Sequence, residues 1–108
     1  DSSAYFEDIL DAIGAIRQYT AELGREDFGR DRKTVDAVLR NLEVIGEAVK
    51  QLPADVRSAH SDVEWQKIAG LRDILIHAYF GVDLDIIWDV VVNKLPDLDV
   101  RVRRILGP

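Results

Sequence analysis

The fold class follows from residues 34–52, TVDAVLRNLEVIGEAVKQL. The apolar residues of this stretch recur three or four positions apart, which places their side chains on one face of an α-helix. They are Val35, Val38, Leu39, Leu42, Ile45, Val49 and Leu52. Pro53 lacks the backbone N–H that a continuing helix needs, so we expect the helix to end there. The stretch therefore predicts an amphipathic helix from Thr34 to Leu52.

The flanking segments have the same helical period, and none shows a convincing period of two. A helix is predicted from Ser3 to Leu23, with Ser2 or Ser3 as its N-cap. Another is predicted from Trp65 to Phe80, capped by Ser61 or Asp62 and stopped by Gly81. A fourth is predicted from Leu84 to Leu95, and Pro96 begins a fifth helix or an extension of the fourth. We expect a solvated loop over Gly24–Lys33 and a short helical turn over Pro53–His60. The predicted fold is all-α, an up-and-down four-helix bundle with a short fifth C-terminal helix or extension.

Composition indicates one globular domain over residues 1–108. The chain has a formal net charge of −6, 47% hydrophobic residues, 31% charged residues and no cysteine. The absence of cysteine excludes a disulfide framework and a Cys-based zinc site, and fits a reducing compartment. No secretory signal or long apolar run is seen, so we expect a cytoplasmic protein without a membrane span. An acidic total disfavours broad adhesion to nucleic acid, but it allows a local cationic site.

The predicted helix from Trp65 to Phe80 carries an arginine within its apolar arc. Arg72 is costly to bury unpaired, so it needs an acidic partner such as Glu43 or Glu47, a subunit seam or an anionic ligand. One interpretation is structural: an internal ion pair for Arg72, an ordinary i,i+4 pair of Asp73 and His77, and a core position for Tyr79. The other is functional, because a guanidinium, an imidazole, a carboxylate and a phenol are the groups that phosphate chemistry requires.

The same residues carry a resemblance to a known family. Arg72-Asp-Ile-Leu-Ile-His77-Ala-Tyr79 resembles the R-x4-H-x-Y signature of the HEPN superfamily, and specifically of HepT-like toxins encoded beside a MntA-type nucleotidyltransferase antitoxin. Three further stretches are similar to that family: IGEA at 45–48, WQKIAGLR at 65–72, and Val82-Asp83 followed by Trp88. The resemblance covers most of the chain.

This resemblance implies a homodimeric, metal-independent endoribonuclease toxin of a type VII-like toxin–antitoxin pair, with a composite cleft between two subunits. Arg72 would bind the scissile phosphate, and His77 would act as general acid/base for attack by the ribose 2′-hydroxyl. Asp73 would orient the cleft. Tyr79 would receive AMP from the nucleotidyltransferase, which would silence the site. The implied partners are RNA, the antitoxin and a second copy of the chain.

Other chemistries have weaker support. A metal site would need several converging ligands, and the chain has only two histidines, His60 and His77, of which His60 is expected to be exposed. No phosphate-binding glycine loop is present, so we expect no cofactor on this chain. Clustered basic residues at 25–33 and 101–104 could guide RNA or be plain surface charge. Two alternatives to a nuclease stay open: a non-catalytic module that is partner and substrate of a nucleotidyltransferase, and a structural helical dimer.

Overall fold

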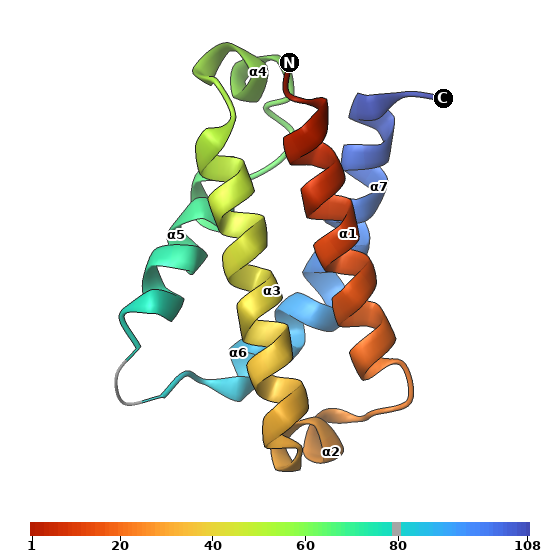
Figure 1. Cartoon of the computed structure of the whole chain (residues 1–108), viewed down its shortest axis with the longest axis vertical. Helices are drawn as coiled ribbons and strands as arrows, with labels where there is room; N and C mark the ends of the chain where they lie inside the picture. The colour runs from red at the N-terminus through yellow and green to blue at the C-terminus, as the bar shows by residue number, and fades with distance from the viewer. Residues whose placement is uncertain (79–80) are drawn as a thin grey trace.

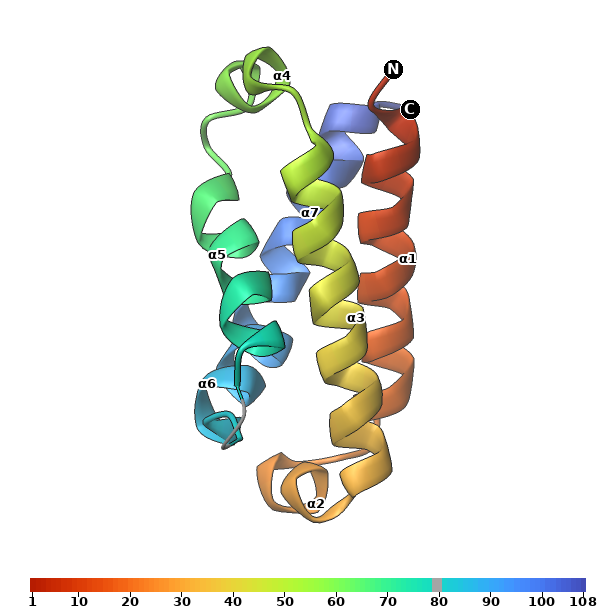
Figure 2. The same ribbon diagram turned by 60° about the vertical axis from the view of Figure 1, so that its left-hand side comes forward.

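The computed structural model describes residues 1–78 and 81–108, and those residues form an all-α bundle. Its long helices are α1 (Ser3–Thr20), α3 (Arg32–Gln51), α5 (Trp65–Ile76) and α7 (Leu95–Leu106). Their directions alternate, so the predicted up-and-down arrangement is confirmed (Figure 1). The closest packing joins α1 with α3 and α3 with α5, and Figure 2 shows α1 and α5 on opposite sides of α3.

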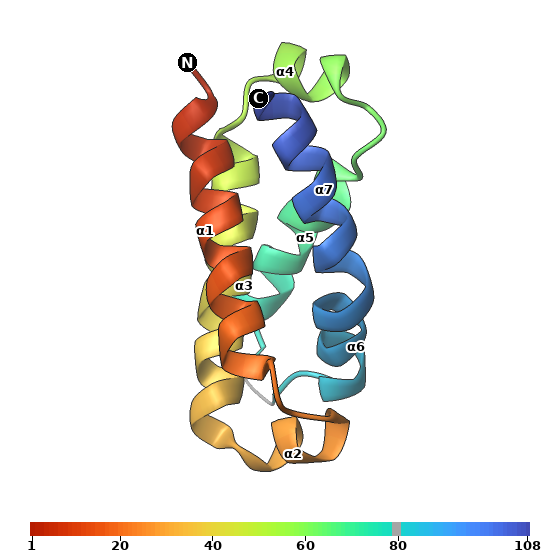
Figure 3. The same cartoon turned by 90° about the vertical axis from the view of Figure 1, so that its right-hand side faces the viewer.

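The core lies where the apolar faces of these helices meet. Its fully buried side chains include Ile9, Ile13 and Ile16 of α1, Val38, Ile45 and Val49 of α3, and Val102 of α7. α7 runs beside α1 (Figure 3). At the start of α5, Trp65 packs on Phe6 with ring centroids 6.2 Å apart, which ties this helix to α1. None of the helices among the described residues is long and apolar enough to cross a membrane.

The predicted loop over Gly24–Lys33 is wrong in part, because it contains the short helix α2 (Arg25–Arg30). Phe28 is fully buried there and lies against Trp88, with ring centroids 5.0 Å apart. Charged residues surround Phe28 in the sequence and favoured a loop, but burial of one aromatic ring outweighs them.

Several predicted helix ends differ from the structure. α1 ends at Thr20, whose hydroxyl donates to the carbonyl of Ile16, rather than at Leu23. α3 begins at Arg32 because the Asp31 carboxylate caps it by accepting the backbone N–H of Thr34. The short helix α4 (Ala54–Ala59) confirms the expected turn. Glu64 precedes α5 without a side-chain cap, so the predicted caps at Ser61 or Asp62 are wrong.

The predicted fourth and fifth helices form one continuous path, so the fifth is an extension of the fourth. α6 (Leu84–Asp89) leads into a π-helical segment, η1 (Val90–Lys94), and then into α7. Pro96 at the first turn of α7 has no N–H to offer the carbonyl of Val92, and the N–H of Leu95 reaches back five residues to Val90. The π-helical turn accommodates a proline inside a continuous helix.

Candidate functional site

Arg72 lies where α5 comes closest to α3, and Gly46 makes this approach possible. A Cβ at position 46 would overlap with the Cβ of Arg72 and would lie 3.1 Å from its Cγ and 3.3 Å from its Cα. Gly46 is buried in the middle of α3, between Ile45 on the core side and Glu47 on the outside. The absence of a side chain at Gly46 therefore seats the Arg72 backbone directly on α3.

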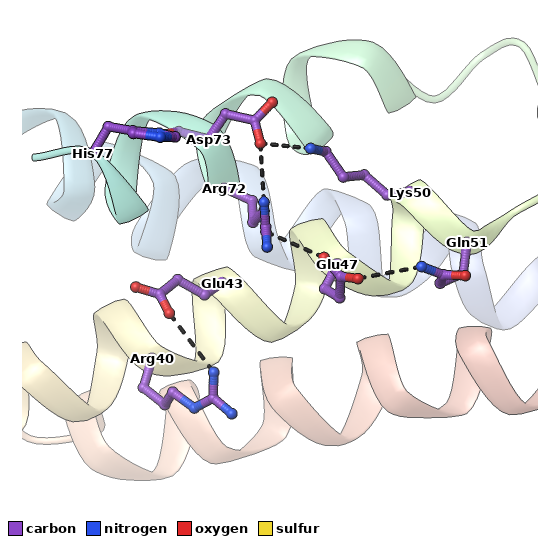
Figure 4. A network of polar contacts seen from close by, with 8 residues as sticks. All are labelled: Arg40, Glu43, Glu47, Lys50, Gln51, Arg72, Asp73 and His77. Atoms are coloured by element: carbon purple, nitrogen blue, oxygen red, sulfur yellow. Dashed lines mark hydrogen bonds and ion pairs between the residues drawn. The ribbon is translucent and has the colours of Figure 1, made fainter.

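A chain of charged groups extends from this point across both helices (Figure 4). Nε of Arg72 lies 3.2 Å from Oε2 of Glu47, and its Nη1 donates to Oδ1 of Asp73 at 3.2 Å. Lys50 Nζ donates to the same Asp73 oxygen at 2.5 Å. Glu47 also accepts from the side-chain amide of Gln51. The acidic partner expected for Arg72 is thus present as Glu47 of α3 and Asp73 of its own helix.

The second acidic candidate, Glu43, pairs instead with Arg40 at 3.7 Å. Both contacts of Arg72 remain accessible to solvent, since the side chains of Arg72 and Glu47 are 28% and 50% exposed. The ion pair of Arg72 and Glu47 is therefore not buried in the core, and an anionic ligand can reach the guanidinium. Lys50 was not predicted as a site residue. Its position one turn beyond Gly46 on the face toward α5 is the signal that could have found it.

The Asp73 carboxylate binds the side chains of Lys50 and Arg72 and not the imidazole of His77. The hydrogen bond from Lys50, and secondarily that from Arg72, lowers the pKa of Asp73 below its usual value of 3.8. Asp73 is accordingly ionised throughout the neutral range. The interpretation of Asp73 and His77 as an ordinary i,i+4 side-chain pair is wrong, because His77 bonds the backbone of Asp73 and its carboxylate turns to Lys50 and Arg72.

His77 is the first residue after α5, which ends at Ile76 rather than at the predicted Phe80. The backbone N–H of His77 donates to the carbonyl of Leu75. In a continuing helix it would donate to the carbonyl of Asp73, and here the ring Nδ1 of His77 lies 2.8 Å from that carbonyl instead. The side chain thus replaces the backbone in satisfying a carbonyl of the last helical turn. Gly81 does adopt a left-handed φ of 100°, but α5 has already ended before it.

The hydrogen bond of Nδ1 determines which tautomer the exposed imidazole of His77 adopts. A carbonyl oxygen only accepts hydrogen bonds, so Nδ1 carries the proton of the neutral ring and Nε2 is left as the basic nitrogen. This nitrogen is on an exposed side chain at the end of α5. The backbone thus sets the tautomer and leaves an accessible nitrogen that can accept a proton.

The functional groups of one chain do not converge. The Arg72 side chain points toward α3, whereas His77 lies at the end of α5 (Figure 4). Among the described residues, no hydrogen bond joins them. Tyr79, the predicted AMP acceptor, lies outside the described residues.

The remaining candidates carry little site chemistry. His60 is half-buried rather than exposed, and its carbonyl accepts the indole N–H of Trp65. The basic residues proposed to guide RNA are largely paired with carboxylates, as in Arg25 with Asp85 and Arg101 with Asp62 and Asp97. Within residues 1–78 and 81–108, no three His, Asp or Glu side chains are placed to hold a metal ion.

An apolar groove opens between α5 and the path of η1 and α7. Its volume is about 690 Å³, and its apolar lining comes from α3, α5, η1 and α7, including Leu42, Ile68, Leu71, Ile74, Val90, Leu95 and Leu98. Ile74 is 65% exposed at this groove, one position beyond Asp73. The groove and this side chain together make a contiguous apolar surface, which is typical of a place where another molecule binds.

Comparison with known proteins gives a consistent assignment for nearly the whole chain. The family model described as ribonuclease HepT-like matches residues 9–105. A Thermococcus cleftensis protein named probable ribonuclease HepT is 48% identical over 94 residues, which are 87% of this chain and 86% of that protein. A candidate RNase of Methanocaldococcus jannaschii is 47% identical over 97 residues, covering 90% of this chain and 80% of its own length. No solved structure gives a significant match.

Proposed function

The chain belongs to the ribonuclease HepT-like family, and from that premise we propose that it is a metal-independent endoribonuclease acting through Arg72 and His77. The observation that carries the proposal is the His77 ring. Its Nδ1 is held by the Asp73 carbonyl, which leaves Nε2 basic and accessible, five residues beyond an arginine that is paired with Glu47.

The reaction is an in-line transfer within the RNA. Nε2 of His77 takes the proton of a ribose 2′-hydroxyl as that oxygen attacks the adjacent phosphorus. The bond from phosphorus to the 5′-oxygen breaks, the departing oxygen takes up a proton from water, and the His77 imidazolium returns its proton to the solvent. The products are a 2′,3′-cyclic phosphate and a free 5′-hydroxyl. Arg72 binds the phosphate oxygens as negative charge grows on them, and Asp73, which accepts from both Arg72 and Lys50, contacts the guanidinium from its own helix.

A second copy of the chain completes the site. Because Arg72 and His77 of one chain point to different places, a two-fold pair can bring each His77 beside the Arg72 of the other copy. The apolar groove and the exposed Ile74 supply a surface for such contact next to Asp73. The proposal is a homodimer with α5 near the symmetry axis.

Control by a partner follows from the sequence motif. Tyr79 stands at the position that the HepT-like signature gives to the AMP acceptor. An AMP group there would add bulk and a negative charge close to Arg72 in the sequence, and it would compete with RNA phosphate for the guanidinium. The chain is thus proposed as the toxin of a toxin–antitoxin pair with a MntA-type nucleotidyltransferase.

The test is cleavage of labelled RNA by the purified chain in excess EDTA, beside a His77→Ala variant. We expect cleavage by the wild type, with 2′,3′-cyclic phosphate ends, and a fall of about 10²- to 10⁴-fold for His77→Ala. Equal cleavage by both proteins would indicate a contaminating nuclease. No cleavage by either, together with AMP transfer to the chain, would favour the non-catalytic module.

A further inference from the structure

The segment of α3 from Gly46 to Lys50 meets α5 at the residues proposed for phosphate binding. Gly46 admits the backbone of Arg72, Glu47 lies against its guanidinium, and Lys50 binds the carboxylate of Asp73. Residue 50 is four positions after residue 46 and three after residue 47, so it shares a side of α3 with each of them. One short stretch of α3 therefore sets both the place of Arg72 and the direction of its side chain.

The two carboxylates that contact Arg72 constrain it differently. Asp73 follows Arg72 on the same helix, so it connects the guanidinium to α3 indirectly, through the hydrogen bond from Lys50. Glu47 belongs to α3, which packs against both α1 and α5 at the centre of the bundle. Among the described residues, Glu47 alone gives the guanidinium an ion-pair contact from another helix.

The position of the contact leaves most of the guanidinium free. Glu47 lies at Nε, and Asp73 accepts from Nη1. A guanidinium carries five N–H donors, so about three stay available to phosphate oxygens. A carboxylate at Nε limits rotation of the long side chain without covering its outer edge, and arginine loses little entropy on binding once its plane is set.

Fold stability gives little reason for this contact. The Glu47 side chain is half exposed, and ion pairs of that exposure contribute little to folding, because water solvates both partners well in the unfolded chain. A charge that adds little stability but holds a catalytic guanidinium is suited to positioning. A carboxylate beside a phosphate-binding arginine also weakens anion binding, which a residue selected for affinity alone would not do.

We propose that Glu47 is the positioning residue of Arg72, holding the guanidinium from α3 so that its outer N–H groups meet the scissile phosphate. The inference rests on the proposed ribonuclease function. It predicts that loss of Glu47 lowers kcat and leaves KM unchanged or lower, since removal of the carboxylate relieves repulsion of the RNA while the arginine loses its orientation.

The test compares Glu47→Gln, Glu47→Asp and a control, Asp36→Asn. Asp36 is also on α3, is 60% exposed and pairs with Arg32, away from Arg72. We expect kcat to fall roughly 10- to 100-fold in Glu47→Gln, in line with the cost of a misplaced catalytic group. Glu47→Asp should recover part of this loss, and Asp36→Asn should cleave as the wild type does. All melting temperatures should stay within roughly 4–8 °C of the wild type.

Two kinetic results would overturn the proposal. A kcat of Glu47→Gln equal to that of Asp36→Asn would show that Arg72 does not need the contact. A higher kcat/KM in Glu47→Gln with kcat maintained would mean that Glu47 only competes with RNA for the guanidinium.

A second measurement separates this inference from the ribonuclease proposal. The Nε–H resonance of Arg72, assigned by its loss in Arg72→Lys, should shift in Glu47→Gln, which removes the carboxylate charge 3.2 Å from Nε, but not in Asp36→Asn. If the wild type fails to cleave RNA, the proposed function fails, and this resonance still reports whether Glu47 holds Arg72. An unchanged resonance in Glu47→Gln would overturn the positioning role whatever the cleavage result.

Discussion

Replacement of Gly46 by alanine is expected to push α5 away from α3. The added Cβ would overlap with the Cβ of Arg72, which is attached directly to the backbone and cannot move aside by rotating a side chain. Relief therefore requires a shift of the helix itself. Overpacking of this kind costs about 1–3 kcal/mol, whereas the better helix propensity of alanine returns about 1 kcal/mol.

Gly14→Ala is the matched control. Gly14 lies inside α1, and a Cβ there would meet no atom within 4 Å. This variant should gain the same propensity of about 1 kcal/mol without a packing cost. The difference in unfolding free energy between the two variants is then the packing cost alone, about 1–3 kcal/mol in favour of Gly14→Ala.

Thermal unfolding followed by circular dichroism measures this difference. For a domain of this size, each kcal/mol corresponds to roughly 4–8 °C in melting temperature, so Gly46→Ala should melt well below Gly14→Ala. Its RNA cleavage should also fall, because Arg72 moves with α5. Equal melting temperatures for the two variants would refute the close approach of Arg72 to α3, and with it the account of how Arg72 is placed.

Three further predictions follow from the charged groups and the motif. Arg72→Ala should lose RNA cleavage but lower the unfolding free energy by at most about 1 kcal/mol, since its partner Glu47 is half exposed and becomes solvated. Arg72→Lys should restore little cleavage, because lysine lacks the planar fork of donors. An Arg72→Ala variant that is unfolded in circular dichroism would show instead that the ion pair is essential to the fold. The stabilisation from the contacts of Asp73 with Lys50 and Arg72 should be complete above the usual carboxyl pKa of 3.8. It should be lost as pH falls through the lower pKa of the folded protein, because protonation removes the acceptor of Lys50 and Arg72. The unfolding free energies of the wild type and Asp73→Asn should therefore converge at low pH, and a constant difference between them at all pH values would contradict this role of Asp73. Tyr79→Phe should fold normally and gain no AMP mass after incubation with its cognate nucleotidyltransferase and ATP, whereas an AMP-sized increment equal to that of the wild type would place the acceptor elsewhere.

Helical periodicity was sufficient to predict most of the fold. The stripe from Val35 to Leu52 specifies α3, because a helix that buries one face must repeat its apolar residues at that spacing. Phe28 shows the limit of this reasoning: a single apolar residue among charges has no period, and only its tertiary contact with Trp88 reveals that the segment is buried. The end of α5 at Ile76 was also missed, since it depends on a side-chain bond from His77 to the backbone.

The motif singled out the candidate site residues, and the structure supplied their contacts. Arg72, Asp73 and His77 stand out in the sequence by residue type, and an acidic partner for Arg72 was expected on the second long helix. Glu47 could not be chosen over Glu43 from spacing, because both lie on the same face of α3 and the choice depends on how far α5 slides along it. Gly46 sets that position by close approach, which no property of a single helix reveals.

The central claim is that Arg72 of one chain and His77 of another cut RNA together, and a mixing experiment tests it most directly. Arg72→Ala and His77→Ala are each purified, shown to be folded and inactive, then mixed in equal amounts and allowed to exchange subunits before RNA cleavage is measured in EDTA. A mixed dimer would contain one intact pair of Arg72 and His77 if the pair spans the interface, so the mixture should recover about a quarter of the wild-type rate. A mixture as inactive as either variant alone would contradict the shared site.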